Sequence, residues 1–190
     1  MYNHIAAGIS PSQSTLYDPT RETENCGVGL VAQLKQIPSR RVVTDSDEML
    51  IRMSHRGGCG CDPNSGDGAG MLVGMPDSFM RAQSQSTFSS DLPEIGKYTV
   101  GNLFFPRDDE AIAFCKKTMA NLITQHSLKL VGWREVPTNN SMLGQDPLDS
   151  EPLTLQVFIT NPGAFSNRDF ERVLMKIRKV CVFFGICHRS

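Results

Sequence analysis

The chain has 190 residues, of which 39% are hydrophobic and 21% are charged, and 19 basic against 20 acidic residues give a net charge of −1. This composition is typical of one globular domain, and the balanced charge argues against nucleic acid as a partner. No stretch approaches the ~18 consecutive apolar residues of a membrane helix. Residues 1–16 also lack the basic and apolar regions of a secretory signal.

The six cysteines are dispersed along a chain long enough to bury its own core. A disulfide scaffold is therefore not required, and we expect a reducing compartment.

The first part of the chain contains a polar segment, two apolar runs and one amphipathic stretch. Residues 1–25 are polar and without periodicity, so we interpret them as a leader ahead of the folded core. The apolar runs over 26–34 and 71–75 have the length of buried strands. Between them, apolar residues at helical spacing follow a group of acidic residues, which favour the N-terminal end of a helix dipole. This pattern predicts a helix over 44–54.

The rest of the chain alternates strands with helices. Residues 97–105, 128–136 and 153–160 are predicted strands, and the last two flank a loop rich in proline, asparagine and aspartate. One helix is predicted over 108–126 with Asp108 as its cap, and a last helix is predicted to start at Ser166 or Asn167. Their apolar faces are Ile112, Cys115, Met119, Leu122 and Ile123 in the first, and Phe170, Val173, Leu174 and Ile177 in the second. About five strands and three helices predict a mixed α+β fold.

Cys26 is a candidate for covalent chemistry. It stands at the head of the first predicted strand, and glycines at 27 and 29 leave room for another group to approach. Its position alone favours a buried strand cysteine, since cysteine is among the most buried residue types. The alternative, a nucleophile, depends on the motifs that follow.

The glycine-rich segment over 55–70 has several readings. It lacks the Gly-Lys-Ser/Thr ending of a phosphate-binding loop and the helix of a dinucleotide fingerprint, so nucleotide binding is disfavoured. Asp67 is interpreted as a turn-forming residue rather than a catalytic acid, because aspartate beside glycine is ordinary turn chemistry. Cys59 and Cys61 have no second Cys or His pair at zinc-finger spacing, so they make a weak metal site. His126 and His188 are isolated and are interpreted as surface residues.

Four motifs, in order and spacing, resemble the start of the glutamate synthases. They are Leu-Tyr-Asp-Pro at 16–19, Cys-Gly-Val-Gly-Leu-Val-Ala at 26–32, Met-Ser-His-Arg-Gly-Gly at 53–58 and Ser-Gly-Asp-Gly-Ala-Gly-Met-Leu at 65–72. Further similarity over 44–62 and 131–139 most resembles the NADH-dependent form of plants. The resemblance covers about residues 15–180. It implies a class II glutamine amidotransferase, or glutaminase, domain over 26–180 with the αββα sandwich of N-terminal-nucleophile hydrolases.

The resemblance also implies roles for individual residues. Cys26 resembles the catalytic nucleophile, and residues 1–25 resemble a propeptide removed between Asn25 and Cys26. Arg56 resembles a substrate-binding residue whose guanidinium would hold a carboxylate of glutamine. An arginine that only braces the glycine-rich loop through backbone carbonyls is an equally open interpretation.

Cofactors, partners and location follow from the resemblance in the same way. FMN, an iron–sulfur cluster and NADH acting through FAD are implied for the complete enzyme, but none for this segment. L-glutamine and the remaining glutamate synthase domains are the implied partners, with no nucleic acid and no membrane. The resemblance suggests a plastid, although no Ser- and Arg-rich transit peptide precedes Leu16; otherwise the cytoplasm is expected.

The sequence departs from the family in three places. It has no Asn-Gly dipeptide, which supplies oxyanion donors in the family, and no Arg-Phe-Ser-Thr-Asn-Thr stretch, which helps to bind glutamine. Residues 181–190 form a divergent tail. We therefore expect a truncated product with an incomplete sandwich, an unpaired sheet edge and an uncovered apolar face. The alternative function is a non-catalytic fragment or interaction module that retains Cys26; a thiol-based metal module is a third, weaker one.

Overall fold

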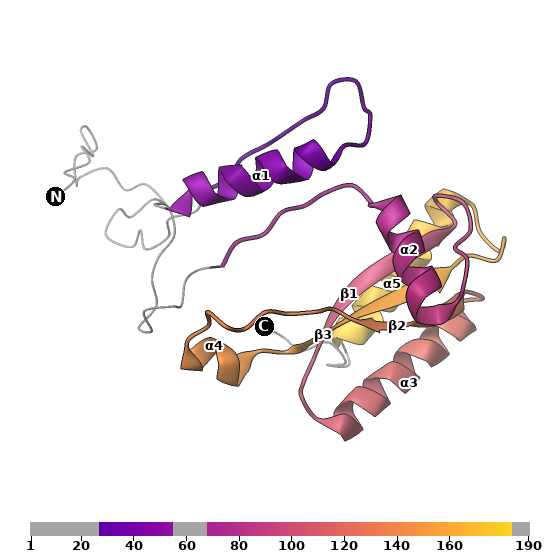
Figure 1. The fold of residues 1–190 in the computed structure, drawn as a ribbon. Helices are drawn as coiled ribbons and strands as arrows, with labels where there is room; N and C mark the ends of the chain where they lie inside the picture. Colours follow the sequence, from indigo (N-terminus) through magenta and orange to yellow (C-terminus); the bar gives the residue numbers. More distant parts are fainter. Residues whose placement is uncertain (1–26, 55–67, 184–190) are drawn as a thin grey trace, which may run out of the picture. The chain divides into compact units, whose positions relative to one another are not determined.

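A computed structural model describes residues 27–54 and 68–183 (Figure 1). The described residues fall into two compact units. The first contains residues 27–54 and 68–71, and the second contains residues 72–183.

The first unit contains helix α1, Arg40–Arg52. Ser39 caps it, because its hydroxyl accepts a hydrogen bond from the N–H of Arg41 at 3.2 Å. The predicted start at residue 44 was wrong, since the acidic residues do not form the first turn. Asp45 instead pairs with Arg41 at 3.4 Å, and Glu48 pairs with Arg52 at 2.8 Å, in the i,i+4 spacing that stabilises a helix.

The strands predicted over 26–34 and 71–75 are not found in the residues described there. Residues 27–34 and 71–75 form no strand, and Val28 and Leu30 are 92% and 88% exposed. An extended segment becomes a strand only when a neighbouring segment pairs with its backbone groups. The apolar composition therefore indicated a tendency to be buried, and it could not indicate a pairing partner.

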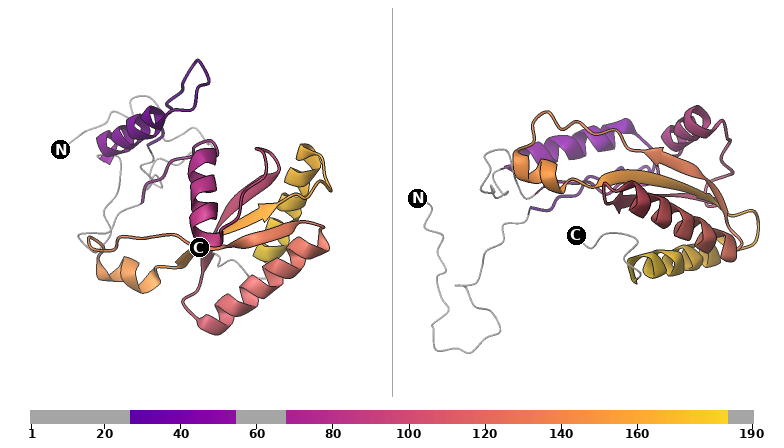
Figure 2. Two further views of the ribbon diagram at one scale, coloured as in Figure 1. Left: turned by 45° about the vertical axis from the view of Figure 1, so that its right-hand side comes forward. Right: turned by 90° about the horizontal axis from the view of Figure 1, so that it is seen from below.

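The second unit is built on one antiparallel sheet of β1, β2 and β3 (Figure 2). The strands are Tyr98–Phe105, Lys129–Glu135 and Leu153–Thr160, and their order is β1-β3-β2. All three confirm the strands predicted in this part of the chain, and the α+β class is confirmed. The described residues hold three strands and five helices, so the predicted count of about five and three was wrong. They contain a single sheet, and the two-sheet sandwich stays a prediction.

The second unit also contains four helices. They are α2, Asp77–Phe88; α3, Asp109–Gln125; α4, Gln145–Ser150; and α5, Asn167–Phe183. The cap predicted for α3 is confirmed, since the Asp108 carboxylate accepts the N–H of Ala111 at 2.7 Å. Ser166 caps α5, because its hydroxyl accepts the N–H of Asp169 at 3.2 Å. The short α4 lies inside the segment predicted to be a loop, and α2 was not predicted.

The main core lies between one face of the sheet and the helices α3 and α5, which share that face in both views of Figure 2. Alternate strand residues point to it, and the apolar faces predicted for α3 and α5 are the ones that pack there. The buried members are Leu103, Phe105, Cys115, Met119, Ile123, Leu128, Leu155, Val157, Ile159, Phe170, Val173, Ile177 and Cys181. This cluster confirms both predicted helix faces.

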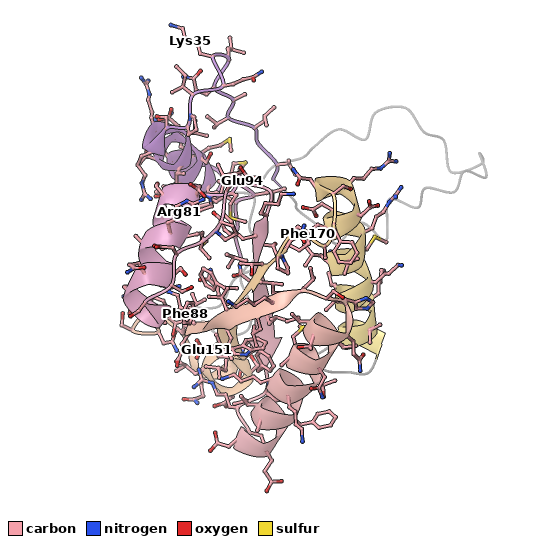
Figure 3. The ribbon with its side chains drawn as sticks, turned by 90° about the vertical axis from the view of Figure 1, so that its right-hand side faces the viewer. Lys35, Arg81, Phe88, Glu94, Glu151 and Phe170 are labelled. Atoms are coloured by element: carbon pink, nitrogen blue, oxygen red, sulfur yellow. The ribbon has the colours of Figure 1, made fainter. Side chains whose placement is uncertain are left out.

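Helix α2 packs on the opposite face of the sheet, as the labelled Phe88 and Phe170 on either side of it illustrate (Figure 3). The ring of Phe88 meets that of Phe158 edge-on, with centroids 5.3 Å apart. Gly132 lies beneath Phe88, at an irregularity in the pairing of β2 with β3. A Cβ on Gly132 would stand 2.5 Å from the Phe88 ring, so only glycine allows this contact.

Candidate functional site

The residues predicted to carry the chemistry, Cys26 and Arg56, lie outside the described residues. The same is true of Asp67, of the Cys59 and Cys61 pair, and of His188. Their predicted roles therefore stay predictions. The structure describes the segments next to the two principal candidates, residues 27–37 after Cys26 and helix α1 before Arg56.

Gly29 and Met49 bring these two segments together within the first unit. A Cβ built on Gly29 would collide with the thioether of Met49, so the backbone after Cys26 approaches α1 as closely as glycine permits. Met49 belongs to the last turn of α1, which ends at Arg52, shortly before Arg56. The contact joins the chain that follows the predicted nucleophile to the helix that leads to the predicted substrate-binding arginine.

The two cysteines in the described residues are unsuited to nucleophilic catalysis. Cys115 and Cys181 are 5% and 1% exposed in the main core, and the sulfur of Cys181 lies 3.5 Å from that of Met119. Burial raises the pKa of the Cys115 thiol. Since the thiolate is the reactive form, a thiol held protonated in apolar surroundings is inert.

A row of polar side chains crosses the sheet on the face that α2 covers. The amide of Gln156 on β3 donates to Asn102 on β1 at 3.1 Å and accepts from Arg134 on β2 at 2.8 Å. Arg134 also donates to Gln83 on α2 at 2.8 Å. Gln156 is buried, and its amide oxygen and nitrogen each have one of these partners. The row is a structural link between the three strands and α2, and sequence reasoning missed it because its members are far apart along the chain.

A second cluster fixes α2 to β1 and to the loop between them. The Arg81 guanidinium bonds both carboxylate oxygens of Asp77 at 3.0 and 2.9 Å and donates to the carbonyls of Leu92 and Pro93. Tyr98 donates its hydroxyl to Asp77 at 2.7 Å. The i,i+4 spacing of Asp77 and Arg81 was the available signal for α2.

The pKa values of this cluster lie far from neutrality. The hydrogen bond from Arg81 lowers the pKa of Asp77, and the hydrogen bond to Asp77 raises the pKa of Arg81. Burial, with the neighbouring carboxylate, raises the pKa of Tyr98 to about 12. Asp77 and Arg81 therefore stay ionised and Tyr98 stays neutral near pH 7, so the cluster holds structure and is no acid–base pair there.

Neither a metal cluster nor a membrane-spanning helix occurs within residues 27–54 and 68–183. In these ranges no three His, Cys, Asp or Glu side chains are placed to hold a metal ion. No helix in them has both the length and the apolar composition to cross a bilayer. His126 is half-buried at the C-terminal end of α3, where its backbone N–H donates to the carbonyl of Leu122 at 3.1 Å.

Comparison with known proteins agrees with the sequence motifs. Residues 26–185 match the family described as class-II glutamine amidotransferases. The chain is 36% identical over 182 residues to glutamate synthase (NADH) of Saccharomyces cerevisiae. The aligned part covers 91% of this chain and 8% of the yeast protein.

Two further relatives give similar figures. The glutamate synthase (NADPH) large chain of Bacillus subtilis is 39% identical over 93% of this chain and 11% of its own length. Ferredoxin-dependent glutamate synthase 1, chloroplastic/mitochondrial, of Arabidopsis thaliana is 37% identical over 92% and 11%. The resemblance drawn from the motifs is thereby confirmed, and the chain spans 8–11% of the length of these relatives.

Proposed function

This chain belongs to the class-II glutamine amidotransferases, and from that premise we propose that it is the nucleophile-bearing part of the glutaminase of a glutamate synthase. One observation carries the proposal: the family match begins at residue 26, the residue that the motifs single out as the nucleophile. Residues 1–25 then act as a propeptide. Cleavage between Asn25 and Cys26 makes the sulfur-bearing residue the first of the mature chain.

Cleavage matters because of the base that it creates. A thiol has a pKa of about 8.5 and an α-amine one of about 7.7 to 8.0, so a free α-amine of Cys26 is well matched to accept the thiol proton. While Asn25 is attached, the same nitrogen is an amide whose lone pair is delocalised into the carbonyl. It cannot then take a proton near neutrality, and the uncleaved chain lacks its general base.

The proposed reaction proceeds through a thioester. The Cys26 sulfur attacks the side-chain amide carbon of glutamine, and the amide oxygen takes up the negative charge of the tetrahedral intermediate. The C–N bond then breaks, the α-ammonium group returns the proton to the nitrogen, and ammonia leaves. Water attacks the γ-glutamyl thioester and releases glutamate. Arg56 holds the substrate through two parallel hydrogen bonds to its α-carboxylate.

The ammonia released by this reaction would be used outside the residues of this chain. We propose that other glutamate synthase domains combine it with 2-oxoglutarate, and that FMN, the iron–sulfur cluster and the electron donor reside there. The relatives that are named for NADH, NADPH and ferredoxin are 36%, 39% and 37% identical to this chain, so these identities do not separate the donors. NADH and a plastid location stay predictions from the motifs.

A second candidate is a non-catalytic fragment that retains Cys26. It is favoured by the lack of an Asn-Gly pair in these 190 residues, since that pair supplies oxyanion donors in the family. Loss of one such donor costs on the order of 2.7 to 4 kcal/mol of transition-state stabilisation. On this candidate the 190-residue chain binds or reacts slowly with glutamine analogues but does not turn glutamine over.

The test is covalent labelling by a diazoketone analogue of glutamine, read by intact-mass and peptide mass spectrometry. Two forms of the chain are compared, one that starts at Met1 and one processed to start at Cys26. We expect one adduct, on Cys26, in the processed form only. Cys26→Ser abolishes the adduct, and the matched control Cys187→Ser retains it.

The outcomes separate the candidates. Labelling of the processed form together with ammonia release from glutamine supports the glutaminase, whereas labelling without release supports the non-catalytic fragment. Equal labelling of the Met1 form contradicts the role of the α-amine. An adduct on another cysteine contradicts the assignment of Cys26.

A further inference from the structure

The two edges of the sheet in the second unit are chemically different. Strand β2, at one edge, carries Lys129, Arg134 and Glu135 and a register irregularity after Leu130, which are features that discourage pairing between edges. Strand β1, at the other edge, has eight residues with no charge and no proline. Within the described residues nothing pairs with its outer side. Of the two sheet edges found in the described residues, only that of β1 therefore lacks these protective features.

The register shows which backbone groups this edge presents. The N–H of Asn161 donates to the carbonyl of Lys97 at 2.8 Å, so residue 97 turns its carbonyl toward the β3 side. Because hydrogen-bonding direction alternates along an antiparallel strand, the even-numbered residues of β1 turn theirs outward. Val100 and Asn102, in the middle of the strand, thus offer N–H and C=O groups to a further strand.

A groove of about 530 Å³ runs beside this edge, between β1 and α5. Its strand side includes Thr99, Gly101 and Leu103, and its helix side includes Leu174 and Met175. Met175 is 55% exposed, whereas Phe170, Val173 and Ile177 of the same helix are buried in the main core. An edge strand and an apolar helix flank thus form one continuous surface.

The charges at the ends of the groove complement each other in a two-fold arrangement. Glu171 and Arg178 both line it, seven positions and so about two helical turns apart on α5, with Leu174 and Met175 at the midpoint. Arg172, the third charged residue of the groove, pairs with Asp169 of its own helix at 3.1 Å, whereas neither Glu171 nor Arg178 belongs to an ion pair in the described part of the chain. An antiparallel second α5 centred on this midpoint would place Glu171 opposite Arg178 twice.

The strand and the helix share the same centre. The eight residues of β1 and the 17 residues of α5 each span about 26 Å. The two elements also start side by side, because a Cβ on Gly96, just before β1, would stand 2.8 Å from the side-chain amide of Asn167, the first residue of α5. The midpoint of α5 therefore lies level with Gly101 and Asn102. One two-fold axis perpendicular to the sheet would pass near both midpoints and would make both the strands and the helices of two copies antiparallel.

We propose that this surface is the interface of a homodimer. Strand β1 pairs with β1 of a second copy to give a six-stranded sheet, and the two α5 helices pack against each other over Leu174 and Met175. Glu171 of each copy faces Arg178 of the other. The interface uses residues of the second unit only, so it is independent of the chemistry proposed for Cys26.

The experiment is sedimentation velocity of the full chain over a range of concentrations. We expect a monomer–dimer equilibrium with a dissociation constant on the order of 10 µM. Glu171→Arg and Arg178→Glu each juxtapose like charges twice in their own dimer, and each weakens dimerisation by at least about tenfold. Lys176→Glu, at an exposed position of α5 outside the groove, is the matched control and leaves the constant unchanged.

An equimolar mixture of the two single variants decides the geometry. In a mixed dimer both ion pairs re-form, one with its original polarity and one with reversed polarity, so the mixture should dimerise about as well as the original chain. Circular dichroism establishes that each variant is folded. A monomeric original chain at about ten times the expected constant, larger assemblies than dimers, or a mixture of folded variants that stays monomeric would overturn the proposal.

Discussion

At the scale of single residues, Gly132 decides how α2 lies on the sheet. The ring of Phe88 occupies the space that any Cβ at 132 would need, and the same ring stacks edge-on against Phe158. Glycine costs some backbone entropy in a strand. Here it permits an aromatic contact that joins a helix to two strands.

Gly132→Ala should therefore destabilise the fold by about 1 to 3 kcal/mol, the usual cost of overpacking. Urea unfolding measures the change. Gly74→Ala is the matched control, because an added Cβ there meets no atom within 4 Å, and it should stay within about 0.5 kcal/mol of the original chain. If Gly132→Ala is as stable as Gly74→Ala, Phe88 does not pack where the structure places it.

Tyr98 gives a prediction for alkaline pH. Its pKa in the folded chain is raised to about 12 from an ordinary value of 10, so the folded state binds the phenolic proton more tightly than the unfolded state. The resulting stability is fully present below pH 10 and is lost as the pH rises from 10 through 12. Tyr98→Phe should remove this dependence, so its melting temperature should fall less than that of the original chain between pH 10 and 11.5.

The control for this measurement is Tyr17→Phe, which removes a different phenol of the chain and keeps Tyr98, the donor to Asp77. An equal fall in melting temperature for Tyr98→Phe and Tyr17→Phe would show that the Tyr98 proton is not linked to folding. At the acidic end, Asp77 has a lowered pKa, so its contribution is present above pH 3.8 and is lost as the pH falls further.

At the scale of elements, the start of α5 depends on one side chain. The Ser166 hydroxyl accepts the N–H of Asp169 and donates to its carboxylate at 2.7 Å, which is a reciprocal cap. The helix carries four residues of the main core, so its first turn positions a large part of the buried surface.

Ser166→Ala should lower the free energy of unfolding by about 1 kcal/mol, and Ser166→Asp should restore most of it, because aspartate also caps helices. Thermal and urea unfolding both measure this. Ser86→Ala on α2 is the control, since the Ser86 hydroxyl is exposed and bonds only a carbonyl of its own helix, that of Gln83. A Ser166→Ala variant no less stable than Ser86→Ala would contradict the capping role.

The same scale shows why some elements could be predicted and others could not. Strands β1, β2 and β3 and helices α3 and α5 each carry a full apolar pattern and a local boundary signal, such as Asp108. Helix α1 was misplaced because its N-cap, Ser39, is followed by two arginines, whereas the acidic residues expected in a first turn come later in the helix. Helix α2 has a weak apolar pattern and is fixed mainly by Arg81, whose partners at 92 and 93 lie outside the helix.

At the scale of the whole molecule, the order and spacing of four short motifs are enough to indicate the family, and the match over residues 26–185 confirms it. On the proposed function, the motifs carry this information because the proposed nucleophile, its neighbouring glycines and the proposed substrate-binding arginine would have to recur at similar positions for the same reaction to occur. The local patterns likewise determined the α+β class, three strands and the apolar faces of two helices, because periodicity within one element depends only on that element.

The tertiary structure alone decided which segments pair and what their edges present. The runs over 27–34 and 71–75 are as apolar as true strands, yet a strand exists only where another backbone completes its hydrogen bonds, and composition cannot name that partner. Three other features could likewise be found only in the tertiary structure. They are the row of polar side chains Asn102, Gln156, Arg134 and Gln83, the strand order β1-β3-β2, and the groove beside β1. Each joins residues tens of positions apart, and such contacts arise only when the packed elements bring them together.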